Sequence, residues 1–158
     1  MPHNILVSSL FAVSSSGSIA VLLNIERKKA LVASLGGGLS WLIYELALLA
    51  TANISISLFM GSMVMGLYSE VLARRLKSPA TIFYIPGFVP LVPGSNVYYS
   101  VLAAVQGQTD EAINQFLNTI IYSAAITLGL IIASAIVAIY LNIKRITLKT
   151  IIKEIRNH

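Results

Sequence analysis

The sequence has no cysteine and few charged residues. Among its 158 residues cysteine is absent, which excludes disulfide bonds, thiolate metal sites and a cysteine nucleophile. Charged residues make up 11% of the chain, whereas a soluble domain usually carries about 25%. So little charge cannot cover a water-facing surface, and 56% of the residues are hydrophobic. The composition therefore predicts an all-α polytopic membrane protein.

Motifs of common enzymes and cofactor proteins are also missing. The sequence contains no Walker loop, dinucleotide fingerprint, zinc motif or nucleophile elbow. The net charge of +5 comes from basic residues placed between apolar runs, not from a basic surface that binds nucleic acid. We therefore expect no catalytic residues, no cofactor, no metal site and no nucleic-acid partner.

Long apolar runs set the expected number of membrane crossings. A helix needs about 20 residues to span a hydrocarbon core of about 30 Å. One further apolar run contains prolines and, as a straight helix, would measure about 42 Å, which predicts a broken crossing. Residues 1–142 are expected to form a single transmembrane domain with five crossings, at about 5–23, 31–51, 54–73, 79–106 (the broken one) and 116–141.

The positions of the basic residues predict the orientation. All eleven Lys and Arg residues fall in alternate connections, at 27–29, at 74–77 and in the tail after residue 141. Connections rich in Lys and Arg remain in the cytoplasm. We therefore expect a plasma-membrane or bacterial inner-membrane protein with its N-terminus outside and its C-terminus in the cytoplasm.

The tail, residues 143–158, has an amphipathic pattern. Leu148, Ile151, Ile152 and Ile155 repeat at helical spacing, and basic residues occupy the opposite face. This pattern is typical of a helix that lies on an anionic membrane surface, with lipids as its partner.

Small residues recur at four-residue spacing in several crossings, for example Ala33 with Gly37 and Ser57 with Gly61. Such faces allow helices to approach closely in lipid. They predict either packing within the chain or contact with a second subunit.

The broken crossing carries most of the candidate binding residues. Each of its prolines removes a backbone donor and interferes with the helix. Irregular backbone at membrane depth is tolerated only inside protein or beside a watery cavity. The alternative is a simple proline kink without a ligand. The candidates for substrate binding or gating are Pro86, Gly87, Pro90, Pro93, Gly94, Ser95, Asn96 and Tyr98.

A new half-helix is expected after the break. Ser95 or Asn96 can cap a helix from about residue 97 to residue 105, whose N-terminus suits a substrate carboxylate. Gly94 is expected to matter most if it adopts a positive φ, where a side chain is strained. In that case Gly94→Val should abolish export while leaving the protein inserted in the membrane.

Pro90, Pro93, Gly94 and Tyr98 form a pattern that resembles the P-x-x-P-G-x-x-x-Y signature of the threonine/serine exporter superfamily. The glycine run at 36–38 and the basic end add to a resemblance to its short, YjjB-type subunit. The resemblance implies export of threonine and serine or, in split two-subunit members, a link to a dicarboxylate such as succinate. It also implies a larger, YjjP-type membrane subunit as partner in a homo- or hetero-oligomer.

Two carboxylates lie within the crossings. Glu45 is a candidate for ion coupling, because burying a charged acid in a membrane is costly and usually functional. The alternatives are that it reaches the outer interface or bonds a hydroxyl. Glu70 is a second candidate, but Arg74 lies four residues later, a spacing that favours an ion pair.

These features together predict a subunit of a secondary exporter for a small carboxylate-bearing metabolite. Two other classes stay open. The first is a membrane assembly or scaffold protein without transport, and the second, for which no constellation of reactive residues is evident, is an intramembrane enzyme.

Overall fold

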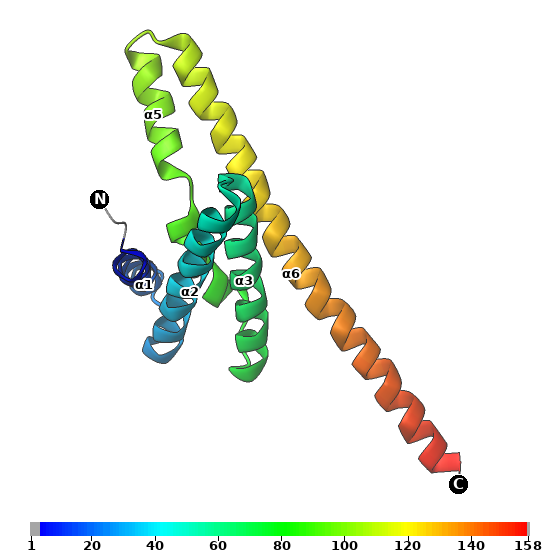
Figure 1. Ribbon diagram of the computed structural model, residues 1–158. Coiled ribbons are helices and arrows are strands. Elements are labelled where there is room, and N and C mark those ends of the chain that lie inside the picture. The colour runs from blue at the N-terminus through cyan, green and yellow to red at the C-terminus, as the bar shows by residue number, and fades with distance from the viewer. Residues whose placement is uncertain (1–3, 158) are drawn as a thin grey trace.

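The computed structural model describes the backbone of residues 4–157 and the side chains of residues 4–144. Within that range the chain is α-helical and contains no β-strand, as the composition predicted. In chain order (Figure 1), the elements are α1 (Ile5–Leu22), α2 (Arg27–Thr51), α3 (Ile54–Arg75), α4 (Thr81–Phe88), the 3₁₀ helix η1 (Val89–Leu91), α5 (Gly94–Val105) and α6 (Thr109–Asn157).

Four helices are long and apolar enough to cross a membrane. They are α1, α2, α3 and the Thr109–Lys144 part of α6. The segment Thr81–Leu91 and α5 pass the same test together, but they are bent by 52° at their break. The structure therefore contains the apolar helical segments that the sequence predicted, with the fourth one broken.

Several helix ends differ from the expected bounds. Arg27 begins α2, so the first basic cluster forms the first turn of that helix and not a loop. The last helix begins at Thr109, not at residue 116, and its 49 residues continue to Asn157 without a break at the start of the tail. At 1.5 Å per residue, α6 is about 74 Å long. Side chains after residue 144 lie outside the described residues, so the amphipathic faces of the tail stay a prediction.

Helix α2 is at the centre of the bundle and packs on α1, α3 and α4. Two small-residue positions show how these helices approach. Gly37 lies against Ser16 of α1, with no room for a Cβ atom. Gly61 of α3 faces the Ser40 carbonyl of α2, and a Cβ at Gly61 would lie 2.9 Å from that oxygen. These small-residue faces are therefore used within the chain, the first of the two expected readings.

The break in the fourth crossing occurs at Val92 and Pro93, and not at Pro86. Val92 has an extended backbone (φ −62°, ψ 129°), the conformation favoured for a residue before a proline. Pro86 instead lies inside α4, where it is buried together with Phe83 and Gly87. The Ser40 hydroxyl of α2 donates to the Gly87 carbonyl at 3.3 Å and so ties α4 to the bundle.

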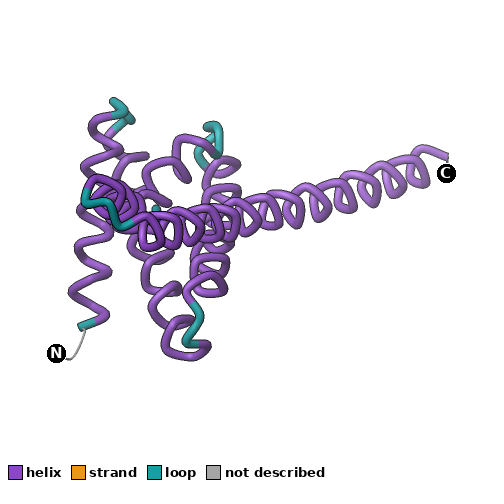
Figure 2. The backbone as a smooth tube through the Cα atoms, turned by 90° about the horizontal axis from the view of Figure 1, so that it is seen from above, coloured by secondary structure: helices purple, strands orange, loops and turns teal. Residues whose placement is uncertain are grey.

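Helices α5 and α6 form a hairpin that extends beyond the ends of α2 and α3 (Figure 1). The C-terminal part of α6 runs out from the bundle toward the C-terminus (Figure 2). Gly107, with φ +75°, makes the turn between them. Inside the hairpin, Asn96 Nδ2 donates to Gln115 Oε1 at 2.9 Å, and Ser100 Oγ donates to the Ala112 carbonyl at 2.9 Å. Helix α5 packs mainly on α6, and α6 also packs on α3.

The apolar core lies where α2, α3, η1 and α6 meet. Its buried centre consists of Leu58, Leu91 and Ile126. Aromatic side chains of Trp41, Tyr44 and Tyr122 pack against this centre. The broken crossing therefore ends its first half inside the core, directly beside a cluster of aromatic rings.

Candidate functional site

Glu45 is a buried carboxylate on α2, with 7% of its surface exposed. Its Oε1 accepts hydrogen bonds from Ser8 Oγ of α1 at 2.6 Å and from Trp41 Nε1 at 2.9 Å. Its Oε2 is buried and has no hydrogen-bond partner among the described residues. One expected alternative, a bond to a hydroxyl, is thus present, yet it satisfies only one of the two oxygens. A buried acid in this state has room for one more donor.

A cavity of about 390 Å³ lies beside this carboxylate and is called the Glu45 cavity here. Its volume is within the range of small-molecule sites, about 300–1,000 Å³. The walls combine one acid with aromatic and aliphatic side chains: Ile5, Trp41, Tyr44, Glu45, Leu48 and Leu49.

A second cavity, of about 230 Å³, lies at the helix break and is called the break cavity. One wall is the irregular segment, from which Pro90, Pro93, Ser95 and Asn96 line the space. Side chains from the neighbouring helices form the opposite wall: Trp41, Tyr44, Ile54, Leu58 and Tyr122.

Trp41 and Tyr44 line both cavities. Their ring centroids are 5.0 Å apart and the rings are tilted by 41°. This aromatic pair therefore stands between the buried acid and the broken helix. Sequence reasoning assigned no role to Trp41. The signal that could have found it is its position four residues before Glu45, which places both side chains on one helix face.

The structure collects some of the predicted break residues and separates others. The break cavity is lined by four of them, Pro90, Pro93, Ser95 and Asn96. Pro86 and Gly87 lie instead in the buried part of α4, where Gly87 faces the Met65 side chain.

Tyr98 is also separated from the break cavity. It is 62% exposed and its ring lies edge-on to Tyr99, with 5.4 Å between the centroids. Tyr98 is therefore on the outer surface of α5 in this chain, away from the residues that precede it in the motif.

The expected capping of the half-helix was wrong. Helix α5 begins at Gly94, with Pro93 at the N-cap position and no side-chain cap. Asn96 uses its side chain to bond Gln115 of α6, so it joins the two helices of the hairpin.

The condition under which Gly94 was expected to matter most, a positive φ, is not met. Gly94 is not among the described residues with positive φ, and a Cβ there would meet no atom within 4 Å. A substitution at Gly94 is therefore neither strained nor crowded in this structure, because the residue has the ordinary backbone of a helix's first turn.

Glu70 is close to the basic end of α3. Its Oε2 lies 3.1 Å from Arg74 Nη2, in the ion pair that the four-residue spacing favours. Glu70 also lines a cavity of about 300 Å³ between α3, α4 and α6. The carboxylate has a cationic partner, and in this respect it differs from Glu45.

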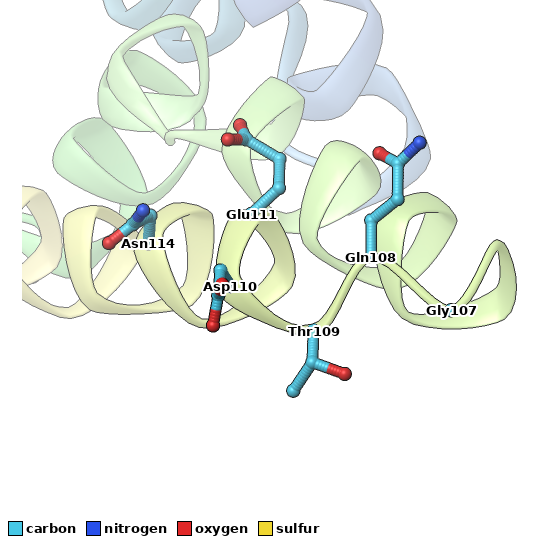
Figure 3. Close-up of a pocket in the computed structure, with 6 residues that line it drawn as sticks. All are labelled: Gly107, Gln108, Thr109, Asp110, Glu111 and Asn114. Atoms are coloured by element: carbon cyan, nitrogen blue, oxygen red, sulfur yellow. The ribbon is translucent and has the colours of Figure 1, made fainter.

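A shallow, polar pocket lies at the turn between α5 and α6 (Figure 3). Asp110 and Glu111 are in the first turn of α6, where acidic residues stabilise the helix dipole. Figure 3 shows Glu111 and Gln108 on one side of the turn, and Thr109 and Asp110 on the other. These side chains do not converge on one point. In the described part of the chain, no three His, Cys, Asp or Glu residues are grouped to hold a metal ion.

Comparison with known proteins identifies the family. Residues 6–136 match the family model described as "Threonine/Serine exporter, ThrE". The chain belongs to the ThrE exporter family. Neither a curated protein nor a solved structure matches the chain significantly. With its long apolar helices, this ThrE-family chain is a multi-pass membrane protein of a transporter family.

The matched residues include both cavities of the ThrE-family chain. The Glu45 cavity and the break cavity are lined by residues between Ile5 and Tyr122, and all except Ile5 fall within residues 6–136. The tail and the last part of α6 lie beyond the match.

Proposed function

We propose that the chain is one subunit of a secondary exporter for a small carboxylate-bearing metabolite, with threonine and serine as first candidates. A dicarboxylate such as succinate is the alternative cargo of the same proposal. The observation that carries it is the pair of adjoining cavities at the broken helix of a ThrE-family chain. Transporters commonly place their substrate sites at such breaks.

The break cavity supplies a site for the substrate carboxylate in this proposal. Helix α5 begins at Gly94, and the next two residues, Ser95 and Asn96, line the break cavity. Backbone N–H groups at a helix N-terminus lack intrahelical partners and carry the positive end of the helix dipole. A carboxylate in the break cavity would accept from these groups.

The proposal includes a second, larger membrane subunit of the YjjP type. Many transporters alternate access with two equal inverted repeats, which five crossings cannot provide. The glycine faces first considered for such a contact, at Gly37 and Gly61, are already filled by helices of this chain. The α5–α6 hairpin is the surface that we assign to this contact, because its outer side chains, such as Val101, Val105, Ile113 and Phe116, are exposed.

The arrangement of the helix ends supports the proposed orientation. The start of α2, the end of α3 and the end of α6 all lie at the lower end of Figure 1, and the α5–α6 turn lies at the upper end. The lower ends carry basic residues, including Arg27, Arg74 and Lys144, whereas the turn is followed by Asp110 and Glu111. The lower end is thus the cytoplasmic side under the positive-inside rule.

Efflux of labelled threonine tests the proposal. Cells that express this chain together with the larger subunit should lose preloaded threonine faster than cells that express either subunit alone. The loss of labelled succinate, measured in the same cells, distinguishes the two cargo classes. Efflux that is unaffected by removal of this chain would overturn the proposal.

A further inference from the structure

Within residues 4–144, whose side chains the structure describes, the buried carboxylate of Glu45 has no cationic partner. In the described residues the ion pairs are Lys29–Glu26 and Arg74–Glu70, and Glu45 takes part in neither. Its hydrogen-bond donors, Ser8 and Trp41, are both neutral. A buried acid without a compensating charge is costly, so it is retained where a proton or a cation completes it.

Among the described residues, the surroundings of Glu45 contain no other strongly charged group. Helix α1 has no ionisable side chain, and α4 and η1 contribute only Tyr84. On α3 the charged residues are Glu70, Arg74 and Arg75, at the end far from Glu45. The phenols of Tyr44 and, across from it, Tyr122 of α6 are the titratable groups on this side of the bundle.

The walls of the Glu45 cavity suit an organic cation. Trp41 and Tyr44 both line it, and aromatic rings attract ammonium groups through their electron-rich faces. Ile5, Leu48 and Leu49 supply apolar walls for a short side chain. The unpartnered Oε2 lacks one donor, and an ammonium group provides up to three.

We infer that Glu45, Trp41 and Tyr44 form a subsite for the ammonium group of the cargo, separate along the transport path from the carboxylate site of the break cavity. This inference rests on the proposed export function and assigns the residues that recognise the ammonium of its amino-acid cargo. The ammonium pairs with the Glu45 carboxylate and donates to Oε2, the oxygen that lacks a donor, while Trp41 Nε1 continues to donate to Oε1. A second carboxylate of a dicarboxylate would meet the like charge of Glu45 and would be repelled.

Trp41 also provides the readout. It is the only tryptophan in the chain, and its Nε1 lies 2.9 Å from Glu45 Oε1. Its fluorescence in the purified full chain, held in lipid nanodiscs, therefore reports on this subsite alone. The probes are L-threonine, succinate and the 2-hydroxy acid in which a hydroxyl replaces the ammonium of threonine.

Threonine should change the fluorescence saturably, and neither the hydroxy acid nor succinate should do so. Glu45→Gln should raise the apparent Kd for threonine about tenfold or more, because a hydrogen bond to a charged partner is lost. Glu70→Gln removes the charge of the other membrane acid and should leave the Kd within about twofold, since Glu70 already pairs with Arg74.

Several results would overturn the inference. One is equal binding of threonine and its hydroxy acid, a comparison that needs only the wild-type chain and so does not depend on the folding of a variant. Another is an unchanged Kd in folded Glu45→Gln. A fluorescence change that follows pH but not threonine would make Glu45 a proton site only. Binding without export would leave the subsite intact and refute the export proposal, whereas export without this binding would do the reverse.

Discussion

Gly129→Ala tests the packing of α6, the helix that joins the bundle to the hairpin. A Cβ at Gly129 would lie 2.6 Å from the Phe59 carbonyl oxygen and 3.0 Å from Met63 N, both backbone atoms of α3. Ordinary contact begins near 3.4 Å, so α3 and α6 must move apart by 3.4 − 2.6 = 0.8 Å. A gap of about 0.5–1 Å forfeits a quarter to a half of the dispersion energy at each contact.

The expected cost of that shift is about 1–3 kcal/mol of unfolding free energy, the usual range for an overpacked interior. An alanine also favours a helix over glycine by about 1 kcal/mol, which acts in the opposite direction. Gly17→Ala is the matched control, because it adds the same methyl group inside α1, where the nearest atom, Ser34 Cβ, would lie at an ordinary contact distance of 3.5 Å.

The assay is the unfolding of each purified variant in the same detergent, monitored by circular dichroism at equilibrium. Gly129→Ala should be less stable than Gly17→Ala by about 1–3 kcal/mol, since both substitutions carry the same helix-propensity gain and their difference isolates the steric term. If Gly129→Ala is as stable as Gly17→Ala or more so, the close contact between α3 and α6 does not exist as described.

Three further predictions concern topology, the aromatic pair and the break. Reporters fused at Asp110 and at the C-terminus should lie on opposite sides of the membrane, because α6 crosses it between them. Finding both on one side would contradict the five-crossing topology. Trp41→Ala should impair export more than Trp41→Phe, because only alanine removes the aromatic ring that separates the two cavities. Equal initial efflux rates of the two variants would contradict that role of the ring. Pro93→Ala should slow efflux more than Pro86→Ala at matched expression, because Val92 before Pro93 makes the break whereas Pro86 lies within a helix.

The sequence was sufficient to predict the helices and the existence of the break. Apolar runs of membrane length identify spanning helices because lipid demands them. The position of the break was predicted to within a few residues, because the second half was expected from about residue 97 and begins at Gly94. The helical backbone at Pro86 was not predictable, since Pro86, Pro90 and Pro93 look alike in the sequence. Packing of α4 against α2, including the Ser40–Gly87 hydrogen bond, accompanies a helical backbone at Pro86, so the chain turns only at Val92.

The candidate site was predictable in part. Glu45 stands out in any apolar run because its burial is costly. Trp41 does not, because a single aromatic residue in such a run is equally suited to face lipid. Tyr98 was chosen for its place in the motif, but the side of α5 that faces the bundle depends on the hairpin with α6, which involves the Asn96–Gln115 contact. A short motif contains no information about that rotation.

The start of α6 shows a further limit. Residues 109–115 are polar enough to suggest a loop, yet they form the first turns of the helix. Asp110 and Glu111 favour a helix N-terminus through the helix dipole, and Gln115 bonds both Glu111 and Asn96. Hydropathy alone measures where lipid lies, and it therefore misses helical turns that continue past the apolar run.

The most direct test of the account is threonine counterflow in proteoliposomes that contain this chain and the larger subunit. The account predicts saturable exchange of labelled threonine by the wild-type complex, loss of exchange in Glu45→Gln, and exchange close to the wild-type rate in Glu70→Gln. Equal exchange by liposomes that contain the larger subunit without this chain would contradict the claim that the chain forms part of the transport path.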